Sequence, residues 1–419
     1  MSTQVQTLKG FRDFLPEQMI IRQKVINTLK EVFESYGFLP IETPSVEYAS
    51  TLLKKYGDEA DKLVYTFEDK GKREVGLIYD LTVPTAKVLA LYQNNISLPF
   101  KRYQIQRVWR ADNTQKGRYR EITMCDFDIF GVSSPMADAE IIAVINAALL
   151  RLKINNFTIK INSRKILFTI LEKLGINDEE QKFSVLQSID KLDKKTKEEV
   201  EQELLEKNIS KEKIAELFQM LDAAKPEDDP DLLRVFQNAQ ELGVKQRSSD
   251  QAGYTFVPYL VRGLNYYTGT IFETVVDEPK IGSVTGGGRY DHLVSMLGGP
   301  DIPAVGSTLG LDRIIDVVEE LNLLSTTSTI TKALVTVFEG YEQQSKATAK
   351  ELRMNGINTE LYLKNDALDK QLKYANKLKI PYAIIIGADE AASNTVKLKN
   401  MKTGEQQALS LSELVKKLT

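Results

Sequence analysis

Two neighbouring stretches combine arginine, tyrosine and glycine in a way that suits an anionic ligand. The first, VRGLNYYTGTIFE, places Arg262 beside a glycine and carries the adjacent pair Tyr266 and Tyr267. The second, TGGGRYDHL, has three consecutive glycines before an arginine and Tyr290. Glycines leave the backbone open to a ligand, arginine forks match phosphate oxygens, and tyrosines add aromatic walls that carry hydroxyl groups. Each feature taken singly also fits a simple turn or strand.

A second group of polar residues falls on a predicted β-hairpin, FKRYQIQRVWR and YREITMCDFDIF joined by the polar turn ADNTQKGR. Strand alternation predicts which side chains share a face. In the second strand one face carries Arg118, Arg120, Met124 and Asp128, and the other, expected in the core, carries Cys125, Phe127 and Ile129. In the first strand one face carries Arg102, Gln104, Gln106 and Arg110. This pattern fits either a solvated sheet face with cross-strand ion pairs or a site for an anionic ligand.

Composition excludes several classes of protein. The chain has 419 residues, 42% of them hydrophobic, which predicts two or three packed domains. One cysteine and one histidine, His292, leave no internal disulfide and little room for a zinc site, and they suit a reducing cytoplasm. The net charge of −3 gives no bulk attraction for nucleic acid, so RNA binding would require local patches. We expect no membrane span and no signal peptide, and no P-loop or G-x-G-x-x-G motif is present.

The arginine-rich strands lie within a longer pattern of elements. Helical spacing of apolar residues predicts a helix over 15–36, stopped by glycine. Strands dominate 75–130, and the charged segment 164–250 favours helices and has no strand pattern. Strands resume at Tyr254. The segment 164–250 is therefore expected to be a helical insertion between strands.

After Leu324 a short polar linker, STTSTIT, precedes a different pattern. The strand-like segments KALVTVF, TELYLK and PYAIIIGA alternate with helical stretches, which predicts a small α/β domain.

The order of these motifs resembles the histidyl-tRNA synthetases, a family of class II aminoacyl-tRNA synthetases. KGFRDFLPEQ resembles the N-terminal signature of the family, and GFLPIETPSVE resembles its motif 1. RVWRADNTQKGRYRE resembles motif 2, and PAVGSTLGLDRI resembles motif 3. Motifs 2 and 3 alone would indicate only class II. VRGLNYYTGTIFE and TGGGRYD resemble the two histidine-specific signatures and narrow the resemblance to this family.

The resemblance implies an α+β fold with an antiparallel catalytic sheet, flanking helices, a helical insertion and a C-terminal α/β anticodon-binding domain. The expected division is a catalytic core in two parts, 1–164 and 251–324, a helical insertion at 165–250 and the anticodon-binding domain at 331–419. The resemblance also implies a cytoplasmic homodimer with Pro44 at its interface. Its substrates would be L-histidine, ATP with Mg²⁺, and tRNA(His). Histidine and ATP would form histidyl-adenylate, and the histidyl group would then pass to the terminal ribose of the tRNA.

The family motifs assign roles in phosphate chemistry to several residues. By resemblance, Arg110 contacts the α-phosphate, Arg313 contacts the γ-phosphate, and Arg262 takes the place of a catalytic metal or base beside the α-phosphate. Asp112 would lie near the adenine and Arg118 at the distal phosphates. These five residues form the expected ATP site, and three of them, Arg262, Arg110 and Arg313, are the expected catalytic residues. No protein side chain is assigned to a metal.

The histidine pocket follows from the same motifs. By resemblance, Asp80 and Thr82 contact the amino group of the substrate, and Asp128, Tyr267 and Tyr290 surround the imidazole. The complete expected set is Asp80, Thr82, Met124, Asp128, Tyr266, Tyr267 and Tyr290. A neutral imidazole has one donor and one acceptor, so a carboxylate and a tyrosine hydroxyl can recognise both ends.

Three positions depart from the family pattern. Met124 stands where members commonly carry glutamine, Asn265 where aspartate is usual, and Ile78 where an arginine often precedes the YDLT motif. Two alternative functions are a synthetase-like regulatory subunit of ATP phosphoribosyltransferase and a non-catalytic RNA-binding or sensor paralogue. The C-terminal domain and Arg262 argue against the first. The three phosphate-type arginines argue against the second, which Met124 favours.

Overall fold

The computed structural model describes residues 5–53, 63–114, 119–248, 251–263, 266–324 and 328–419. The chain divides into two compact units. The first comprises residues up to 13 together with 25–324, and the second comprises 14–24 together with 325–419. No helix among the described residues is both long and apolar enough to cross a membrane.

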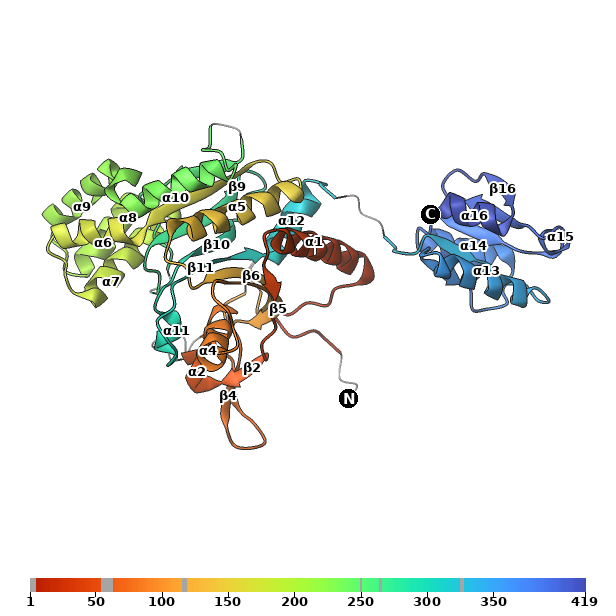
Figure 1. Ribbon diagram of the computed structural model, residues 1–419, viewed down its shortest axis with the longest axis horizontal. Helices are drawn as coiled ribbons and strands as arrows, with labels where there is room; N and C mark the ends of the chain where they lie inside the picture. The colour runs from red at the N-terminus through yellow and green to blue at the C-terminus, as the bar shows by residue number, and fades with distance from the viewer. Residues whose placement is uncertain (1–4, 54–62, 115–118, 249–250, 264–265, 325–327) are drawn as a thin grey trace. The chain divides into compact units, whose positions relative to one another are not determined.

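The first unit is built on an eight-stranded sheet (Figure 1). The strand order is β1-β5-β6-β11-β10-β9-β7-β8, and only the outer pairs β1–β5 and β7–β8 are parallel. The bounds are β1 (Leu39–Pro40), β5 (Phe100–Trp109), β6 (Glu121–Phe130), β7 (Phe157–Ser163), β8 (Gly253–Phe256), β9 (Thr270–Val276), β10 (Ser283–Arg289) and β11 (Ala304–Gly310). The expected antiparallel-rich α+β fold is confirmed.

The hairpin predicted from the sequence is the centre of this sheet. β5 and β6 pair in an antiparallel ladder that sets Arg102 opposite Asp128 and Gln106 opposite Met124. The predicted core residues of β6, from Cys125 to Ile129 on alternate positions, are buried. The solvated-face alternative is wrong, because Arg102 and Asp128 on the opposite face are buried as well. Side chains from other parts of the chain, such as Tyr290, lie against that face.

Helices cover the core face of the sheet. α1 (Pro16–Ser35) places Phe33 against Phe127 of β6, with ring centroids 4.9 Å apart. α5 (Pro135–Arg151) packs on β6, β10 and β11, and α12 (Leu311–Glu320) follows β11 directly. The other elements of this part are α4 (Thr82–Tyr92), α11 (Leu293–Met296), α2 (Ala49–Leu53) and a small sheet of β2 (Val46–Tyr48), β4 (Glu74–Leu77) and β3 (Thr66–Glu68).

The segment between β7 and β8 is helical in its described residues, as its charge pattern predicts. Polar caps start its helices: the N-cap residues Ser163, Asp178, Thr196, Ser210 and Asp229 each accept a hydrogen bond from the first turn. The elements are α6 (Arg164–Lys173), α7 (Glu179–Ile189), η2 (Asp190–Asp193), α8 (Lys197–Glu206), α9 (Lys211–Ala223), η3 (Pro226–Asp228) and α10 (Pro230–Glu241). α10 packs on α5, which joins the helical segment to the sheet (Figure 1).

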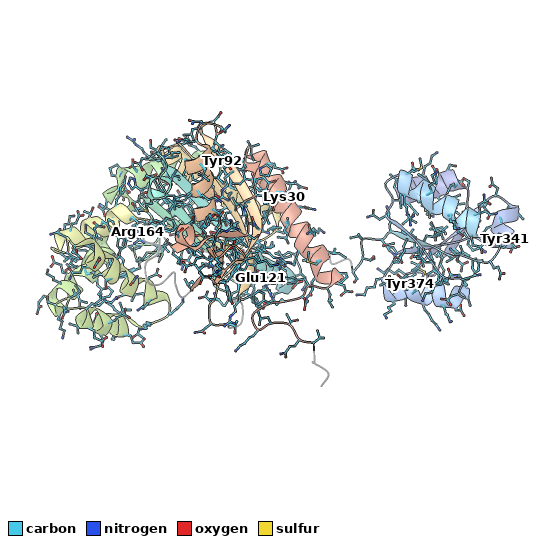
Figure 2. All side chains as sticks on the ribbon, turned by 90° about the horizontal axis from the view of Figure 1, so that it is seen from below. Lys30, Tyr92, Glu121, Arg164, Tyr341 and Tyr374 are labelled. Atoms are coloured by element: carbon cyan, nitrogen blue, oxygen red, sulfur yellow. The ribbon has the colours of Figure 1, made fainter. Side chains whose placement is uncertain are left out.

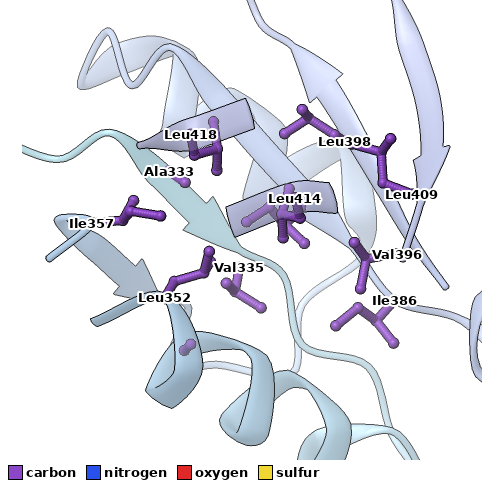
Figure 3. Close-up of a cluster of buried hydrophobic side chains, with 12 residues drawn as sticks. Ala333, Val335, Leu352, Ile357, Ile386, Val396, Leu398, Leu409, Leu414 and Leu418 are labelled. Carbon is purple, nitrogen blue, oxygen red and sulfur yellow. The ribbon is translucent and has the colours of Figure 1, made fainter. Parts of the chain in front are cut away.

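The second unit contains a five-stranded sheet in the order β13-β12-β14-β15-β16. Its apolar core is closed by Leu414 and Leu418 of the last helix (Figure 3). The bounds are β12 (Ala333–Val335), α13 (Glu342–Met354), β13 (Thr359–Leu361), α14 (Leu368–Lys377), β14 (Tyr382–Ile385), α15 (Ala388–Ala392), β15 (Val396–Asn400), β16 (Gln406–Leu409) and α16 (Leu411–Leu418). The three predicted strands are parallel neighbours. The sequence analysis did not predict the antiparallel strands β15 and β16, which are short, and β16 is exposed except at Leu409.

Candidate active site

Bare glycine backbone in β10 forms part of the floor of the site. A Cβ atom added to Gly286 would lie 2.2 Å from a guanidinium nitrogen of Arg262, and one added to Gly288 would lie 2.9 Å from the ring of Tyr267. Real Cβ atoms do not make contacts this short, so these two side chains occupy space that only glycine leaves. The glycine run therefore has a structural reason, which is to let the side chains of Arg262 and Tyr267 approach the backbone of β10 closely.

The neighbouring strand β11 makes room for Asp128 in the same way. A Cβ atom on Gly306 would lie 1.7 Å from Oδ1 of Asp128. Asp128 is buried, its Oδ2 pairs with Nη2 of Arg102 at 2.6 Å, and its Oδ1 accepts a hydrogen bond from the Tyr290 hydroxyl. Burial, and then the charge of Asp128, raise the pKa of Tyr290 well above its ordinary value, so the hydroxyl stays protonated and donates. Arg102 is thus a buried partner of Asp128 that the sequence placed on the correct face but did not assign to the site.

Three tyrosines form the aromatic side of the pocket. The ring centroids of Tyr266 and Tyr267 lie 4.7 Å apart, and Tyr266 meets Tyr290 edge to face at 5.7 Å. Tyr267 and Tyr290 are buried, whereas Tyr266 is partly exposed. This arrangement brings together the tyrosines of both sequence stretches next to the buried Asp128 carboxylate.

Asp126 is a buried carboxylate that the sequence analysis did not include among the predicted site residues. It lies two residues before Asp128 on the same face of β6, opposite Thr308 of β11. Burial raises the pKa of Asp126 to about 7; the negative charges of Asp128 and Asp80 act in the same direction, and Arg102 opposes them. Strand parity alone could have placed Asp126 on this face.

The start of α4 supplies two more of the predicted residues. Oδ1 of Asp80 accepts a hydrogen bond from the backbone N–H of Val83 at 3.1 Å, and Asp80 is buried. Thr82 is the first residue of α4 and is partly exposed. Asp80 therefore accepts a hydrogen bond from the first turn of α4 and also adds negative charge near Asp126. Three carboxylates near one buried arginine make this end of the site attractive to a cation such as an ammonium group.

Arg110, which directly follows β5, lies beside Met124 in the first half of β6. Nε of Arg110 donates to the backbone carbonyl of Tyr79 at 3.0 Å, and Nη2 lies 3.8 Å from the Met124 sulfur. Met124 and Ile78 belong to one buried apolar cluster with Leu81 and its neighbours. The two departures from the family pattern at positions 78 and 124 therefore occur in the same cluster, where a thioether fills apolar space.

The remaining predicted arginine on described backbone, Arg313, also contacts β10. Its Nη1 donates to the carbonyl of Ser283 at 2.6 Å. Ser283 is three residues before Gly286, the glycine against which the Arg262 guanidinium packs. Nη1 of Arg262 is 3.7 Å from a carboxylate oxygen of Glu273 in β9.

The motif 2 turn is described only in part. The carbonyl of Asp112 accepts from Nε of Arg120 at 3.1 Å, while Arg118 and Asn265 lie outside the described residues.

The polar face of β6 is long enough for two different groups of side chains. From Met124 to Asp128 this face spans four residues, or about 13 Å along the strand. This separation leaves space for an arginine-rich end and an aromatic, acidic end on one surface. Within the described residues, no three side chains of histidine, cysteine, aspartate or glutamate form a metal-binding group.

The raised pKa of Asp126 predicts a pH dependence of stability. The folded protein keeps a proton that the unfolded chain releases above the ordinary pKa of 3.8, so the stability contribution is complete below that pH and is lost as the pH rises through about 7. Asp126→Asn should remove this loss. We expect the variant to gain up to about 4 kcal/mol of unfolding free energy relative to the wild type between pH 4 and pH 8.

Urea unfolding followed by the fluorescence of the single tryptophan, Trp109 in β5, reports on the first unit alone and tests this expectation. Glu206→Gln, which alters an exposed carboxylate of α8, is the control and should follow the wild type at every pH. Parallel profiles for Asp126→Asn and the wild type would show that Asp126 is ionised throughout.

Comparison with known proteins agrees with the motif resemblance. Residues 10–314 match the family model described as histidyl-tRNA synthetase, and residues 331–419 match the anticodon binding domain. A histidine–tRNA ligase of Cytophaga hutchinsonii is 41% identical over 448 residues, covering 98% of each chain. One of Rhodopirellula baltica is 39% identical over 431 residues, covering 98% of this chain and 96% of the relative. The crystal structure of histidyl-tRNA synthetase from Nostoc sp. PCC 7120 matches with a TM-score of 0.85 and 30% identity, covering 100% of this chain and 99% of that one. The chain belongs to the histidyl-tRNA synthetase family.

Proposed function

We propose that this protein joins L-histidine to tRNA(His) through a histidyl-adenylate intermediate. The observation that carries the proposal is the buried Asp128 carboxylate, held by Arg102 and Tyr290 on the face that also carries Arg262. An acidic, aromatic pocket suits an imidazole and an ammonium group, and arginines suit the phosphates of ATP. Relatives that match over nearly their full length are named histidine–tRNA ligases.

In this proposal the pocket recognises both nitrogens of the imidazole ring. Asp128 accepts a hydrogen bond from the ring N–H, and the Tyr267 hydroxyl donates to the other nitrogen, while the Tyr290 hydroxyl donates to Asp128. Asp80 and Thr82 receive the α-ammonium group of the substrate. Tyr266 and Met124 complete the walls.

The first chemical step is the attack of the histidine carboxylate on the α-phosphorus of ATP. A carboxylate oxygen–phosphorus bond forms, the bond to the bridging oxygen breaks, and pyrophosphate leaves with the electron pair. Two anions must meet and charge grows on the leaving group, so fixed cationic donors lower the barrier. We assign Arg110 and Arg262 to the α-phosphate and Arg313 to the γ-phosphate. In the second step a hydroxyl of the terminal ribose attacks the histidyl carbonyl, and AMP leaves.

Among the described residues, no cluster of side chains would form a cage for the metal that accompanies ATP. Mg²⁺ in ATP-dependent enzymes is held by phosphates and one or two carboxylates. Glu273, next to Arg262, is a carboxylate on this part of the face and would suit that role. Asp112 and Arg118 are proposed for the adenine and the distal phosphates, as the resemblance implies.

The larger organisation follows the same proposal. The catalytic core comprises 1–164 and 251–324, the helical insertion 165–250 and the anticodon-binding domain 331–419. The protein is proposed to be a cytoplasmic homodimer with Pro44 at its interface. Light scattering on the purified protein tests whether it is a dimer.

The direct test is ATP–pyrophosphate exchange with each of the twenty amino acids. We expect exchange with L-histidine alone, followed by histidylation of tRNA(His) when tRNA is added. A wild-type protein that is folded and shows no histidine-dependent exchange would contradict the proposal. That outcome would favour a regulatory subunit or a sensor.

Arg262→Ala should lower the kcat of exchange about 10²- to 10³-fold, the usual effect of removing one donor to a developing charge. The Michaelis constants for ATP and histidine should change much less, because the contact matters chiefly in the transition state. Arg151→Ala, which removes an exposed arginine of α5, is the matched control and should leave exchange unchanged. A near wild-type kcat for Arg262→Ala would refute the assignment.

The second unit offers an open groove between α14 and the β15–β16 hairpin for RNA. Lys373, Lys399 and Lys402 line it, together with Asn376. Replacing the three lysines with alanine should raise the Michaelis constant for tRNA and make the logarithmic salt slope of tRNA binding shallower by about two to three. Histidine-dependent exchange should not change, because it needs no tRNA.

The double variant Lys346→Ala/Lys350→Ala, on exposed positions of α13 in the same unit, controls for general charge. An equal rise in the Michaelis constant for both sets would exclude the groove as the specific RNA contact.

A further inference from the structure

Arg262 has a backbone conformation that its residue type disfavours. Its φ angle is +62°, in the left-handed region that favours glycine. A non-glycine residue in a sparsely populated region of this kind costs on the order of 1–3 kcal/mol and persists only when its surroundings fix it. The guanidinium that lies over Gly286 therefore depends on contacts that hold this backbone.

Two side chains hold the peptide groups of Arg262 from opposite sides. The backbone N–H donates to Oδ1 of Asp190 at 3.1 Å. The backbone carbonyl accepts from Nη2 of Arg164 at 2.7 Å. Both partners belong to the helical segment: Asp190 opens η2, and the buried Arg164 is the first residue of α6 (Figure 2). Both are charged, which strengthens such hydrogen bonds.

The chain that leads into Arg262 is fixed from the same place. The side-chain amide of Asn162, at the end of β7, donates to the carbonyls of Pro258 and Leu260, each at 2.9 Å. Asn162 is fully buried. The backbone of Arg262 is therefore set by the junction at 162–164 and by Asp190, which is 72 residues away in sequence.

Asp190 is itself held by the packing of α7, η2 and α8. Glu203 of α8 accepts hydrogen bonds from Ser188 at 2.9 Å and from Lys191 at 2.6 Å, on either side of Asp190. The Lys191 ammonium is the main cause that lowers the pKa of Glu203 to about 2. Because Glu203 remains ionised at neutral pH, this connection holds η2 against α8.

We propose that Asp190 is a positioning residue for adenylate formation, which accepts the N–H of Arg262 and so fixes the guanidinium over Gly286. The inference rests on the proposed function and adds a residue of the helical segment to the site. Arg164 holds the next peptide group through the carbonyl of Arg262. The helical segment is then part of the catalytic apparatus, because it sets the geometry of a phosphate-contacting arginine.

A double-mutant cycle in ATP–pyrophosphate exchange tests this role. Asp190→Ala should lower kcat on the order of tenfold or more, since a misplacement of about 1 Å can cost up to about a hundredfold, with Michaelis constants changed less than about threefold. Asp190→Asn keeps an acceptor oxygen and should stay within about threefold of the wild type. Combined with Arg262→Ala, Asp190→Ala should have no further effect.

Glu206→Ala, on exposed surface of α8, is the matched control and should behave as the wild type. A multiplicative effect of Asp190→Ala in the Arg262→Ala background, or a full wild-type kcat for Asp190→Ala, would overturn the proposal. If the wild type shows no histidine-dependent exchange, the proposed function fails separately. Crystal structures of the wild type and of Asp190→Ala then decide the proposal, because an unchanged φ angle of Arg262 and an unchanged guanidinium over Gly286 in the variant would overturn it.

Discussion

The burial of Asp128 against Arg102 is the interaction on which the rest of the site depends. A buried carboxylate is tolerated when it is paired and hydrogen-bonded, and here the pairing uses the neighbouring strand β5 while Tyr290 adds a donor. Space for the carboxylate exists only because Gly306 has no side chain. The antiparallel ladder fixes this register, so the sheet itself determines where this buried carboxylate lies.

The same face separates two kinds of chemistry along β6. Carboxylates and tyrosines gather around Asp128, whereas Arg110 lies beside Met124 about 13 Å away along the strand. Ile78 and Met124, the two positions that depart from the resembled motifs on described backbone, belong to one buried apolar cluster. Arg262 reaches this face from a loop. Hydrogen bonds between the backbone of Arg262 and the side chains of Asp190 and Arg164 link the helical segment to the site.

The sequence predicted the hairpin, the core face of β6, the helical segment and the return of strands after it, because strand alternation and helix-favouring charge patterns are local signals. It did not predict that the polar face is buried, since parity assigns a face but not what covers it. Asp126 and Arg102 were missed for this reason. Asp190 carries no local signal, because its partner lies 72 residues away and the contact is made through backbone. The β15–β16 hairpin was missed although Val396 to Lys399 alternate between apolar and polar residues, because both strands are short and β16 is exposed except at Leu409.

The central claim is that buried Asp128 and a tyrosine hydroxyl recognise the two ring nitrogens of histidine. Calorimetric titration of the wild-type protein with L-histidine, and with its two ring-N-methylated forms, tests it without altering the protein. Methylation of either nitrogen removes the capacity to donate there and adds bulk. A pocket that hydrogen-bonds both nitrogens should bind each methylated form on the order of a hundredfold more weakly, or worse. Binding of both methylated forms with the affinity of histidine would contradict the account.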